Sequence, residues 1–156
     1  MRKIVASCLL LCVGSGASAG TPLWQKVEYG MSAAELHAAY PEEKGKVKHG
    51  RSTTTFKNAV SVGSCDVDAV AHHEKGTVDK VTVSNIFCDD AAYTALVSKY
   101  GKPLSDKNSE DDSMLAGDGD KTRRSIWVKD GVTVTMKNDD AGIWTITYRV
   151  LDKTGL

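Results

Sequence analysis

The chain has 156 residues, and its 20 lysine and arginine side chains balance 20 aspartate and glutamate side chains, so its formal charge is zero. A near-neutral surface offers no general electrostatic attraction to nucleic acid or anionic lipid, and neither is expected as a partner. The length, with 41% hydrophobic residues, suits one domain with a core of its own.

The first 19 residues have the three-part layout of a secretory signal peptide. Arg2 and Lys3 precede an apolar run over residues 4–13, and residues 17–19 read Ala-Ser-Ala, a cleavage site. Cleavage would leave a single domain over residues 20–156, which we expect in the periplasm or outside the cell. The apolar run is far shorter than the roughly 20 residues of a membrane span, so no transmembrane segment is expected.

Cleavage would also remove two of the four cysteines, Cys8 and Cys12. Leucines precede Cys12, where a lipid-attachment signal has a small residue, so no lipid anchor is expected. In an oxidising compartment the remaining Cys65 and Cys88 are expected to form a disulfide, which would stabilise the fold by roughly 3 kcal/mol. The alternative is a pair of free, buried thiols.

The first predicted helix begins at a capping box, in which Ser32 and Glu35 exchange hydrogen bonds with backbone amides. Pro41 ends this helix. Residues 44–57 then carry five basic side chains and no acidic one, and they are expected to form a solvated loop that leads into a strand over residues 53–60.

Residues 64–74 and 78–88 are expected to form a hairpin, because Gly76 suits the first central position of a type II′ turn. The register set by this turn would place Cys65 directly opposite Cys88 on one face of the sheet. The turn and the spacing of the cysteines therefore agree on the disulfide.

A second helix is expected over residues 89–100 and is ended by Gly101 and Pro103. Residues 104–121 are rich in acidic side chains and glycine, and they are expected to form a mobile surface loop. One side of the helix is an apolar stripe that should lie against a sheet, made by Tyr93, Leu96, Val97 and Tyr100.

Each predicted helix is followed by strand-like segments, and Leu36 and Tyr40 lie sixty positions before Leu96 and Tyr100. The predicted fold class is therefore α+β, built from two tandem helix-plus-three-strand repeats. These repeats would span about residues 30–88 and 89–151. We expect one antiparallel sheet with the helices packed on one face.

The last three strands are expected to form an antiparallel meander. Asp130-Gly131 is a strong two-residue turn signal that places Trp127 opposite Val134. A wider loop between the second and third strands is expected to pair Met136 with Trp144. The strands are predicted over residues 124–129, 132–137 and 143–151.

Alternation divides this meander into two faces. One face is expected to be core and contains Trp127, Val132, Val134, Met136, Trp144, Ile146 and Tyr148. The other is expected to stay uncovered and is the candidate protein-binding surface, made by Ile126, Val128, Thr133, Thr135, Lys137, Thr145, Thr147 and Arg149.

Motifs for catalysis or cofactor binding are missing from the sequence. There is no nucleophile elbow, phosphate loop or dinucleotide fingerprint, so neither an enzyme nor a cofactor is expected. His72, Glu74 and Asp79 fall on one face, but a third strong ligand at motif spacing is lacking and no metal site is expected. The acidic segment over residues 105–120 lacks the ligand spacing of a calcium loop, and cation binding there is left open.

Three short motifs stand out at the ends of the predicted elements: Gly30-Met31-Ser32 with Glu35-Leu36, Tyr100-Gly101-Lys102-Pro103, and Trp144-x-Ile146-x-Tyr148. With these motifs the chain resembles the superfamily that contains the SmpA/OmlA small outer-membrane-assembly lipoproteins and the β-lactamase inhibitory protein. The resemblance implies an α+β fold of helix-plus-sheet repeats that binds envelope proteins or inhibits an enzyme. The lipid-bearing cysteine of the lipoproteins is missing, as is the aspartate that the inhibitors insert into their target, so no functional residue is carried over.

These observations predict a monomeric, exported protein-binding module whose partner is another protein of the envelope or a secreted enzyme. An inhibitor of such an enzyme is the alternative. A third possibility is a binder of a small apolar ligand, which would require a cavity between the helices and the sheet.

Overall fold

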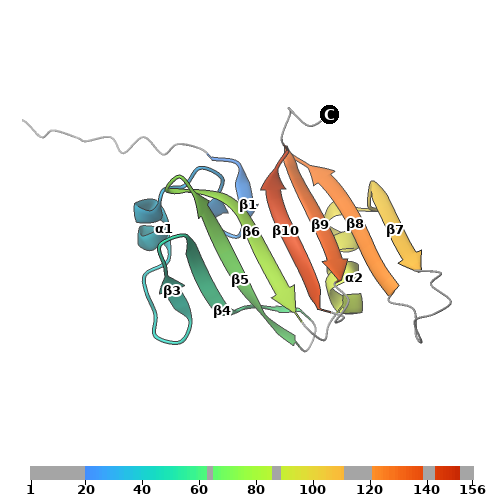
Figure 1. Cartoon of the computed structure of the whole chain (residues 1–156), viewed down its shortest axis with the longest axis horizontal. Helices are drawn as coiled ribbons and strands as arrows, with labels where there is room; N and C mark the ends of the chain where they lie inside the picture. Colours follow the sequence, from blue (N-terminus) through green and yellow to red (C-terminus); the bar gives the residue numbers. More distant parts are fainter. Residues whose placement is uncertain (1–19, 63–64, 86–88, 111–120, 139–142, 152–156) are drawn as a thin grey trace, which may run out of the picture.

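The computed structural model describes residues 20–62, 65–85, 89–110, 121–138 and 143–151. These ranges contain ten strands and two helices (Figure 1). In chain order the elements are β1 (Pro22–Trp24), β2 (Val27–Glu28), α1 (Ala33–Ala39), β3 (Val47–His49), β4 (Thr53–Val62), β5 (Cys65–Glu74), β6 (Thr77–Asn85), α2 (Asp89–Tyr100), β7 (Ser105–Glu110), β8 (Lys121–Lys129), β9 (Val132–Asn138) and β10 (Trp144–Val150).

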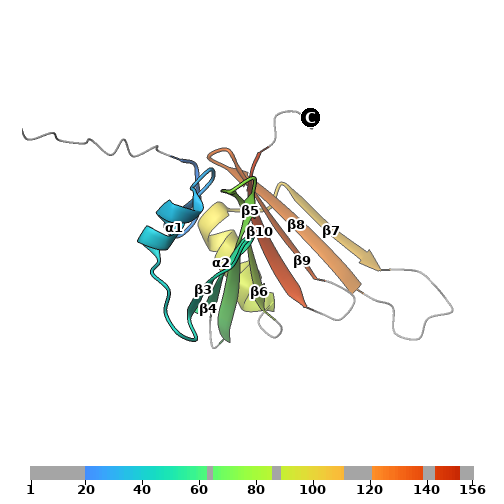
Figure 2. The same ribbon diagram turned by 60° about the vertical axis from the view of Figure 1, so that its left-hand side comes forward.

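Eight of the strands form one continuous antiparallel sheet, in the order β3-β4-β5-β6-β10-β9-β8-β7. The strands on either side of the β6–β10 pair follow one another in sequence, so that this pair joins an N-terminal half of the sheet to a C-terminal half. β1 and β2 form a separate two-stranded ribbon. Figure 2 shows the sheet turned, with α1 and α2 to one side of it.

The predicted α+β fold of two tandem helix-plus-three-strand repeats, with helices packed on one face, is wrong. The structure is mostly β, because the helices contain only 7 and 12 residues beside the eight-stranded sheet. β7 forms at the start of the segment predicted to be a loop, and β3 forms within the basic segment. Both lie at edges of the sheet, where a strand exposes one side to water and a polar sequence is tolerated.

The ends of the helices follow their capping signals. Glu35 N donates to Ser32 Oγ at 3.3 Å and Ser32 N donates to Glu35 Oε2 at 2.8 Å, which confirms the capping box of α1. Gly101 follows α2 with a φ of 82°, and its N–H donates to Val97 O at 2.8 Å. Glycine adopts this left-handed conformation without a steric penalty, so the predicted end of α2 is confirmed.

The β8–β9 hairpin has the predicted register. Asp130 and Gly131 form the turn with φ values of 52° and 77°, and Trp127 lies opposite Val134. The β9–β10 register differs by two residues, because Met136 pairs with Ile146 rather than with Trp144. A shift of two residues keeps every side chain on its predicted face.

The β5–β6 turn is centred one residue earlier than predicted, so that the register next to it differs by two residues, and the type II′ turn is wrong. Lys75 and Gly76 are the central residues, with φ values of 53° and 86°, and both signs are those of a type I′ turn. The register shifts again at an irregularity between His72 and His73. The ladder that was expected to bring Cys65 opposite the second cysteine therefore has a different register.

One face of the sheet carries the core. Trp127 is only 2% exposed, its ring lies 5.9 Å from that of Tyr93 on α2, and its indole N–H donates to Gly101 O at 2.9 Å. In the other half of the sheet Phe56 contacts the rings of Trp24 and Tyr40. The predicted core face of the meander is confirmed, with Val132, Val134, Met136 and Tyr148 buried and with Trp144 and Ile146 only partly buried.

Candidate protein-binding surface

The other face of the sheet, called the open face below, carries the side chains that alternate with the core residues. One residue from each of the eight strands forms a central row across this face, in which each residue lies directly opposite the next. Most of these side chains are threonine or other small polar groups, and none of the eight is buried. From β3 to β7 the row reads Lys48, Thr55, Val70, Thr82, Thr147, Thr135, Ile126 and Ser105.

The structure places all eight candidate binding residues on the open face, over β8, β9 and β10. Val128, Lys137 and Arg149 are exposed. The half-buried members are Ile126, Thr133, Thr135, Thr145 and Thr147. Sequence reasoning missed the continuation of this surface onto β4, β5 and β6, because no local signal indicates that Thr147 pairs with Thr82.

Positive side chains lie side by side on this face. Lys107, Arg124 and Lys137 are directly opposite one another across β7, β8 and β9. Arg149 is directly opposite Lys80 across β10 and β6. Like charges in directly opposite positions destabilise a sheet, so these two cationic rows oppose folding.

Two carboxylates of the open face lie at another corner, on β5. A further one, Asp79, is next to Lys80 in the chain and interacts electrostatically with His72. Asp68 forms an ion pair with Lys57 and also accepts a hydrogen bond from Asn58 N at 3.0 Å. Burial opposes ionisation of Asp68, but these bonds outweigh it and lower the pKa of the carboxyl group. Asp66 is exposed and accepts a hydrogen bond from Ser61. Neither Asp66 nor Asp68 lies between two side chains of a cationic row.

Three histidines meet around Thr54, on the core side of β3, β4 and β5. His49 contacts Thr54 Oγ1 through Nδ1 at 3.0 Å and Tyr40 O through Nε2 at 2.9 Å, so both ring nitrogens have partners. His73 Nε2 lies 3.4 Å from Thr54 Oγ1. The ring of His37 on α1 stacks on that of His49. Among the described residues no group of three or more histidine, cysteine or acidic side chains could hold a metal ion.

This cluster was not predicted from the sequence. Alternation along β5 was expected to send His72 and His73 to opposite faces, and the structure does so, because His72 faces Lys80 across the open face. The rings of His37 and His49 come from α1 and β3, and only the fold brings them to His73. Glu74 lies at the end of β5, opposite Thr77.

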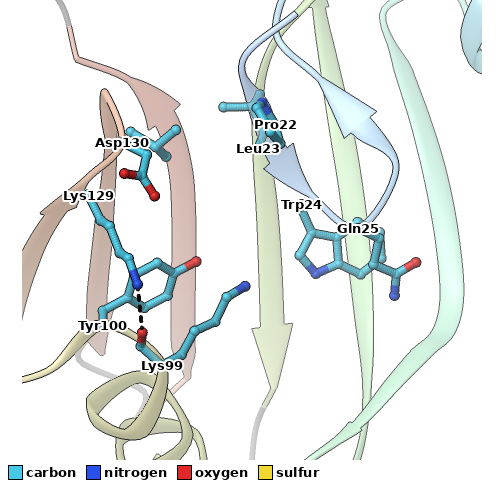
Figure 3. A pocket seen from close by; sticks show the side chains of 9 residues that line it. Pro22, Leu23, Trp24, Gln25, Lys99, Tyr100, Lys129 and Asp130 are labelled. Atoms are coloured by element: carbon cyan, nitrogen blue, oxygen red, sulfur yellow. Dashed lines mark hydrogen bonds between the residues drawn. The ribbon is translucent and has the colours of Figure 1, made fainter. Parts of the chain in front are cut away.

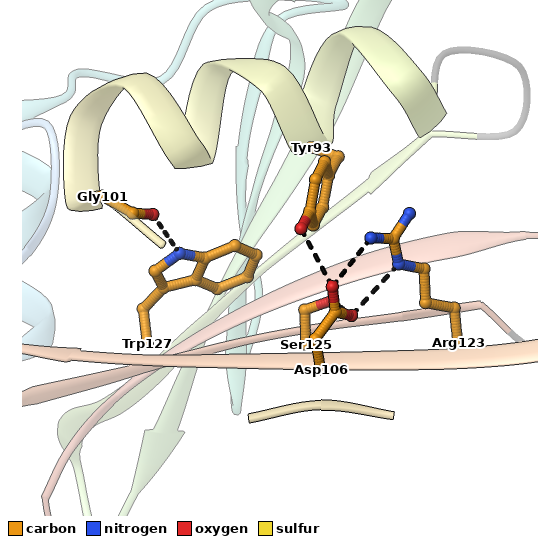
Figure 4. A network of polar contacts seen from close by, with 6 residues as sticks. All are labelled: Tyr93, Gly101, Asp106, Arg123, Ser125 and Trp127. Atoms are coloured by element: carbon orange, nitrogen blue, oxygen red, sulfur yellow. Dashed lines mark hydrogen bonds and ion pairs between the residues drawn. The ribbon is translucent and has the colours of Figure 1, made fainter. Parts of the chain in front are cut away.

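A network of polar contacts anchors β7 to α2 (Figure 4). Asp106 accepts hydrogen bonds from Tyr93 Oη at 3.0 Å, from Ser125 Oγ at 2.7 Å and from Arg123 Nη2 at 2.9 Å. The Arg123 guanidinium also lies 3.9 Å from the centre of the Tyr93 ring. The Arg123 hydrogen bond, helped by those from Ser125 and Tyr93 and opposed by desolvation, lowers the pKa of Asp106 to about 2.

A carboxylate with this many donors is a weak base at neutral pH, so Asp106 is suited to hold β7 in place rather than to accept a proton in catalysis. Sequence reasoning missed the network because Asp106 falls in the segment predicted to be a loop. The remainder of that acidic segment, residues 111–120, lies outside the described residues. The basic segment contributes Lys48 and Lys57 to the open face through β3 and β4.

The predicted disulfide falls partly outside the described residues. Cys65 is the first residue of β5, and it lies opposite Val62. Cys88 is not among the described residues, so the pairing of Cys65 with Cys88 stays a prediction.

No helix in the described ranges combines the length and the apolar composition needed to cross a membrane. The resemblance to the SmpA/OmlA and β-lactamase inhibitory protein superfamily stays a prediction. Comparison of the chain with family models, with curated proteins and with solved structures gives no match.

Proposed function

We propose that this protein is an exported protein-binding module of the cell envelope, without catalysis of its own, and that it binds its partner through the open face. The observation that carries this proposal is the pair of cationic rows, Lys107–Arg124–Lys137 and Arg149–Lys80. Sheets ordinarily place opposite charges or polar side chains in such positions. Sequence choices that oppose folding without a local compensation are typical of functional sites.

The chemistry of the face indicates an acidic partner. Carboxylates of a second protein placed over the two rows would replace repulsion between cations with attraction. The threonines between the rows present a flat surface, and Ile126 and Val128 add apolar area beside them. An apolar and small-polar centre with a charged rim is the usual composition of a protein interface.

The open face is large enough for such an interface. Seven gaps of about 4.8 Å between eight strands give a width of about 34 Å, and the strands, of 3 to 10 residues, run for about 10 to 33 Å. A stable complex of standard size buries about 800 Å² on each partner, which is within this area.

The contacts of Gly20 support the exported location. Its backbone N–H donates to Glu28 Oε2 at 3.0 Å, and a Cβ on residue 20 would lie 2.8 Å from Tyr29 O, so glycine is required there. Cleavage after residue 19 would convert this amide into an ammonium group and the hydrogen bond into an ion pair. The site would thus hold the new N-terminus of a processed chain.

Charge reversal on the open face tests the proposal. Envelope extract would be passed over the immobilised protein, and bound proteins would be identified by mass spectrometry after cross-linking. The double variant Lys137→Glu/Arg149→Glu should lose the acidic partner, as should Thr135→Glu/Thr145→Glu. The matched control is Lys26→Glu/Lys44→Glu, which reverses two exposed charges away from this face and should retain the partner.

Binding should also weaken as the salt concentration rises from 0.05 to 0.5 M, because salt screens exposed charges. Capture that is unchanged in both folded open-face variants contradicts the proposal. If the captured partner is an enzyme, its activity with and without the protein distinguishes inhibition from scaffolding.

A further inference from the structure

Two adjoining cavities lie on the core face of the sheet, between the β1–β2 ribbon and α2. The larger has a volume of about 320 Å³, with Val83 and Ile146 among its sheet residues and Leu96 from α2. The smaller, of about 240 Å³, has apolar residues of β1 on one side and the charged residues Lys99, Lys129 and Asp130 on the other (Figure 3). Both are bordered by Trp24, Gln25 and Lys99. We call the two cavities together the hollow, and its charged side is its polar end.

A buried hydroxyl group borders the apolar cavity. Tyr148 is only 7% exposed, and its hydroxyl has no hydrogen-bond partner in the part of the chain that the structure describes. Buried tyrosine hydroxyls nearly always have such a partner. Burial is the main reason why the pKa of Tyr148 lies well above its ordinary value, and electrostatic repulsion from the nearby Tyr100 raises this pKa further. The Tyr148 hydroxyl is therefore a neutral donor at physiological pH.

The polar end of the hollow carries more positive than negative charge. The ammonium groups of Lys99 and Lys129 lie 5.0 and 5.9 Å from the centre of the Tyr100 ring. Lys129 Nζ donates to Lys99 O at 3.3 Å, as Figure 3 shows. Asp130 is the one carboxylate among the residues that line the two cavities. An anionic group at this end would therefore be attracted.

We propose that this hollow binds a small amphiphilic carboxylate, with its apolar body in the larger cavity. The carboxylate would accept a hydrogen bond from the Tyr148 hydroxyl and pair with Lys99. A volume of about 320 Å³ has room for roughly ten water-sized groups. This size is at the small end of ligand sites and suits a straight-chain acid of about eight carbons.

Octanoate is a suitable probe, and 1-octanol is its uncharged counterpart. We expect octanoate to bind the purified protein at one site, measured by isothermal titration calorimetry, and octanol to bind at least fivefold more weakly. Tyr148→Phe should weaken octanoate binding about five- to tenfold, which is the effect of one lost hydrogen bond. The unliganded variant should keep or raise its melting temperature, because it loses only an unpaired buried hydroxyl.

Two further variants locate the site. Ala95→Phe, at a residue that lines the larger cavity, should abolish binding, whereas Ala34→Phe on the exposed side of α1 should not. Lys99→Gln should weaken the binding of octanoate but not that of octanol. The open-face variant Lys137→Glu/Arg149→Glu should bind octanoate normally, so this test is independent of the proposed protein partner.

The proposal is overturned if octanoate fails to bind at millimolar concentration, or if octanol binds as tightly as octanoate. It is also overturned if folded Tyr148→Phe or Ala95→Phe binds octanoate as the unmodified protein does, because the ligand would then occupy another place. Circular dichroism of each variant confirms that it is folded before binding is measured.

Discussion

The imidazole ring of His37 stacks on that of His49 with ring centroids 3.6 Å apart. This contact joins the last turn of α1 to the edge strand β3, and Thr54 extends it to His73 on β5. Protonation of His73 would place a positive charge in this partly buried site, beside the other two rings. The cluster therefore links the packing of α1 to pH.

We expect the free energy of unfolding to decrease as the pH falls below about 6.5. Desolvation lowers the pKa of His73, and the neighbouring His37 and His49 lower it further, with Asp79 acting in the opposite direction. Because the unfolded chain then takes up the proton first, stability is complete above pH 6.5 and is lost as the pH falls through the pKa of the folded state.

Urea denaturation at pH 7.5 and at pH 5.0 measures this loss. His73→Gln should show a flatter dependence of unfolding free energy on pH, because it removes one of the two histidines whose pKa is lowered, His72 being the other. Equal stability of the unmodified protein at the two pH values contradicts the prediction.

Asp106→Asn should destabilise the protein by roughly 1 kcal/mol, because it weakens the contacts with Arg123 and Tyr93. The value is at the low end for charged hydrogen bonds because the Asp106 side chain is 32% exposed. The pKa of Asp106 is lowered to about 2, so its contribution is present above about pH 4 and is lost as the pH falls toward 2. The exposed pair of Lys46 with Glu43 is the control, and Glu43→Gln should have no measurable effect.

Trp127→Ala should cost roughly 3 to 5 kcal/mol, because it removes a ring that is 2% exposed and leaves a cavity beneath Tyr93. Trp144 is only partly buried, so Trp144→Ala should destabilise the protein less than Trp127→Ala does, by about 1 to 2 kcal/mol. Chemical denaturation of the two variants gives both values. A neutral Trp127→Ala variant would be incompatible with the contact between the Trp127 and Tyr93 rings.

The mature protein should show no titratable thiol when it is denatured without reductant, because Cys65 and Cys88 are expected to form a disulfide. Cys65→Ser should then lower the free energy of unfolding by roughly 2 to 5 kcal/mol. Two reactive thiols per chain in the thiol assay would disprove the disulfide. The register on which this prediction also relied is wrong. Cys65 is nevertheless disulfide-bonded, and its partner lies outside the described residues, so the pairing with Cys88 is what the assay tests.

Local signals in the sequence were sufficient to predict turns and helix ends whose backbone geometry depends on one short segment. The Asp130-Gly131 turn and the capping box of Ser32 and Glu35 each depend on neighbours within a few positions, and both were predicted correctly. At the β5–β6 turn the chain adopts positive φ at Lys75, which a residue other than glycine rarely does. The prediction put Gly76 at the first central position of the turn, where glycine is favoured, whereas Lys75 occupies that position in the structure. The predicted turn was therefore one residue too late.

Long-range pairing explains the other differences. The polar sequence of β7 has no apolar alternation, but its backbone hydrogen bonds are completed by β8 and its Asp106 bonds to Ser125 and Arg123. The full extent of the open face, the histidine cluster and the hollow beside Tyr148 all depend on elements far apart in the chain. Periodicity within one segment carries no information about them.

The β6–β10 pair has a consequence for folding kinetics. It joins residues 80–85 to residues 144–149, whereas every other pair of neighbours in the sheet links strands that are consecutive in the chain. Closing so long a loop costs chain entropy before its contacts form, so each half of the sheet should assemble first and the two should dock late. Both the cationic surface and the hollow draw residues from β6 and β10. Binding competence should therefore appear only in the slowest folding phase, after most of the secondary structure has formed.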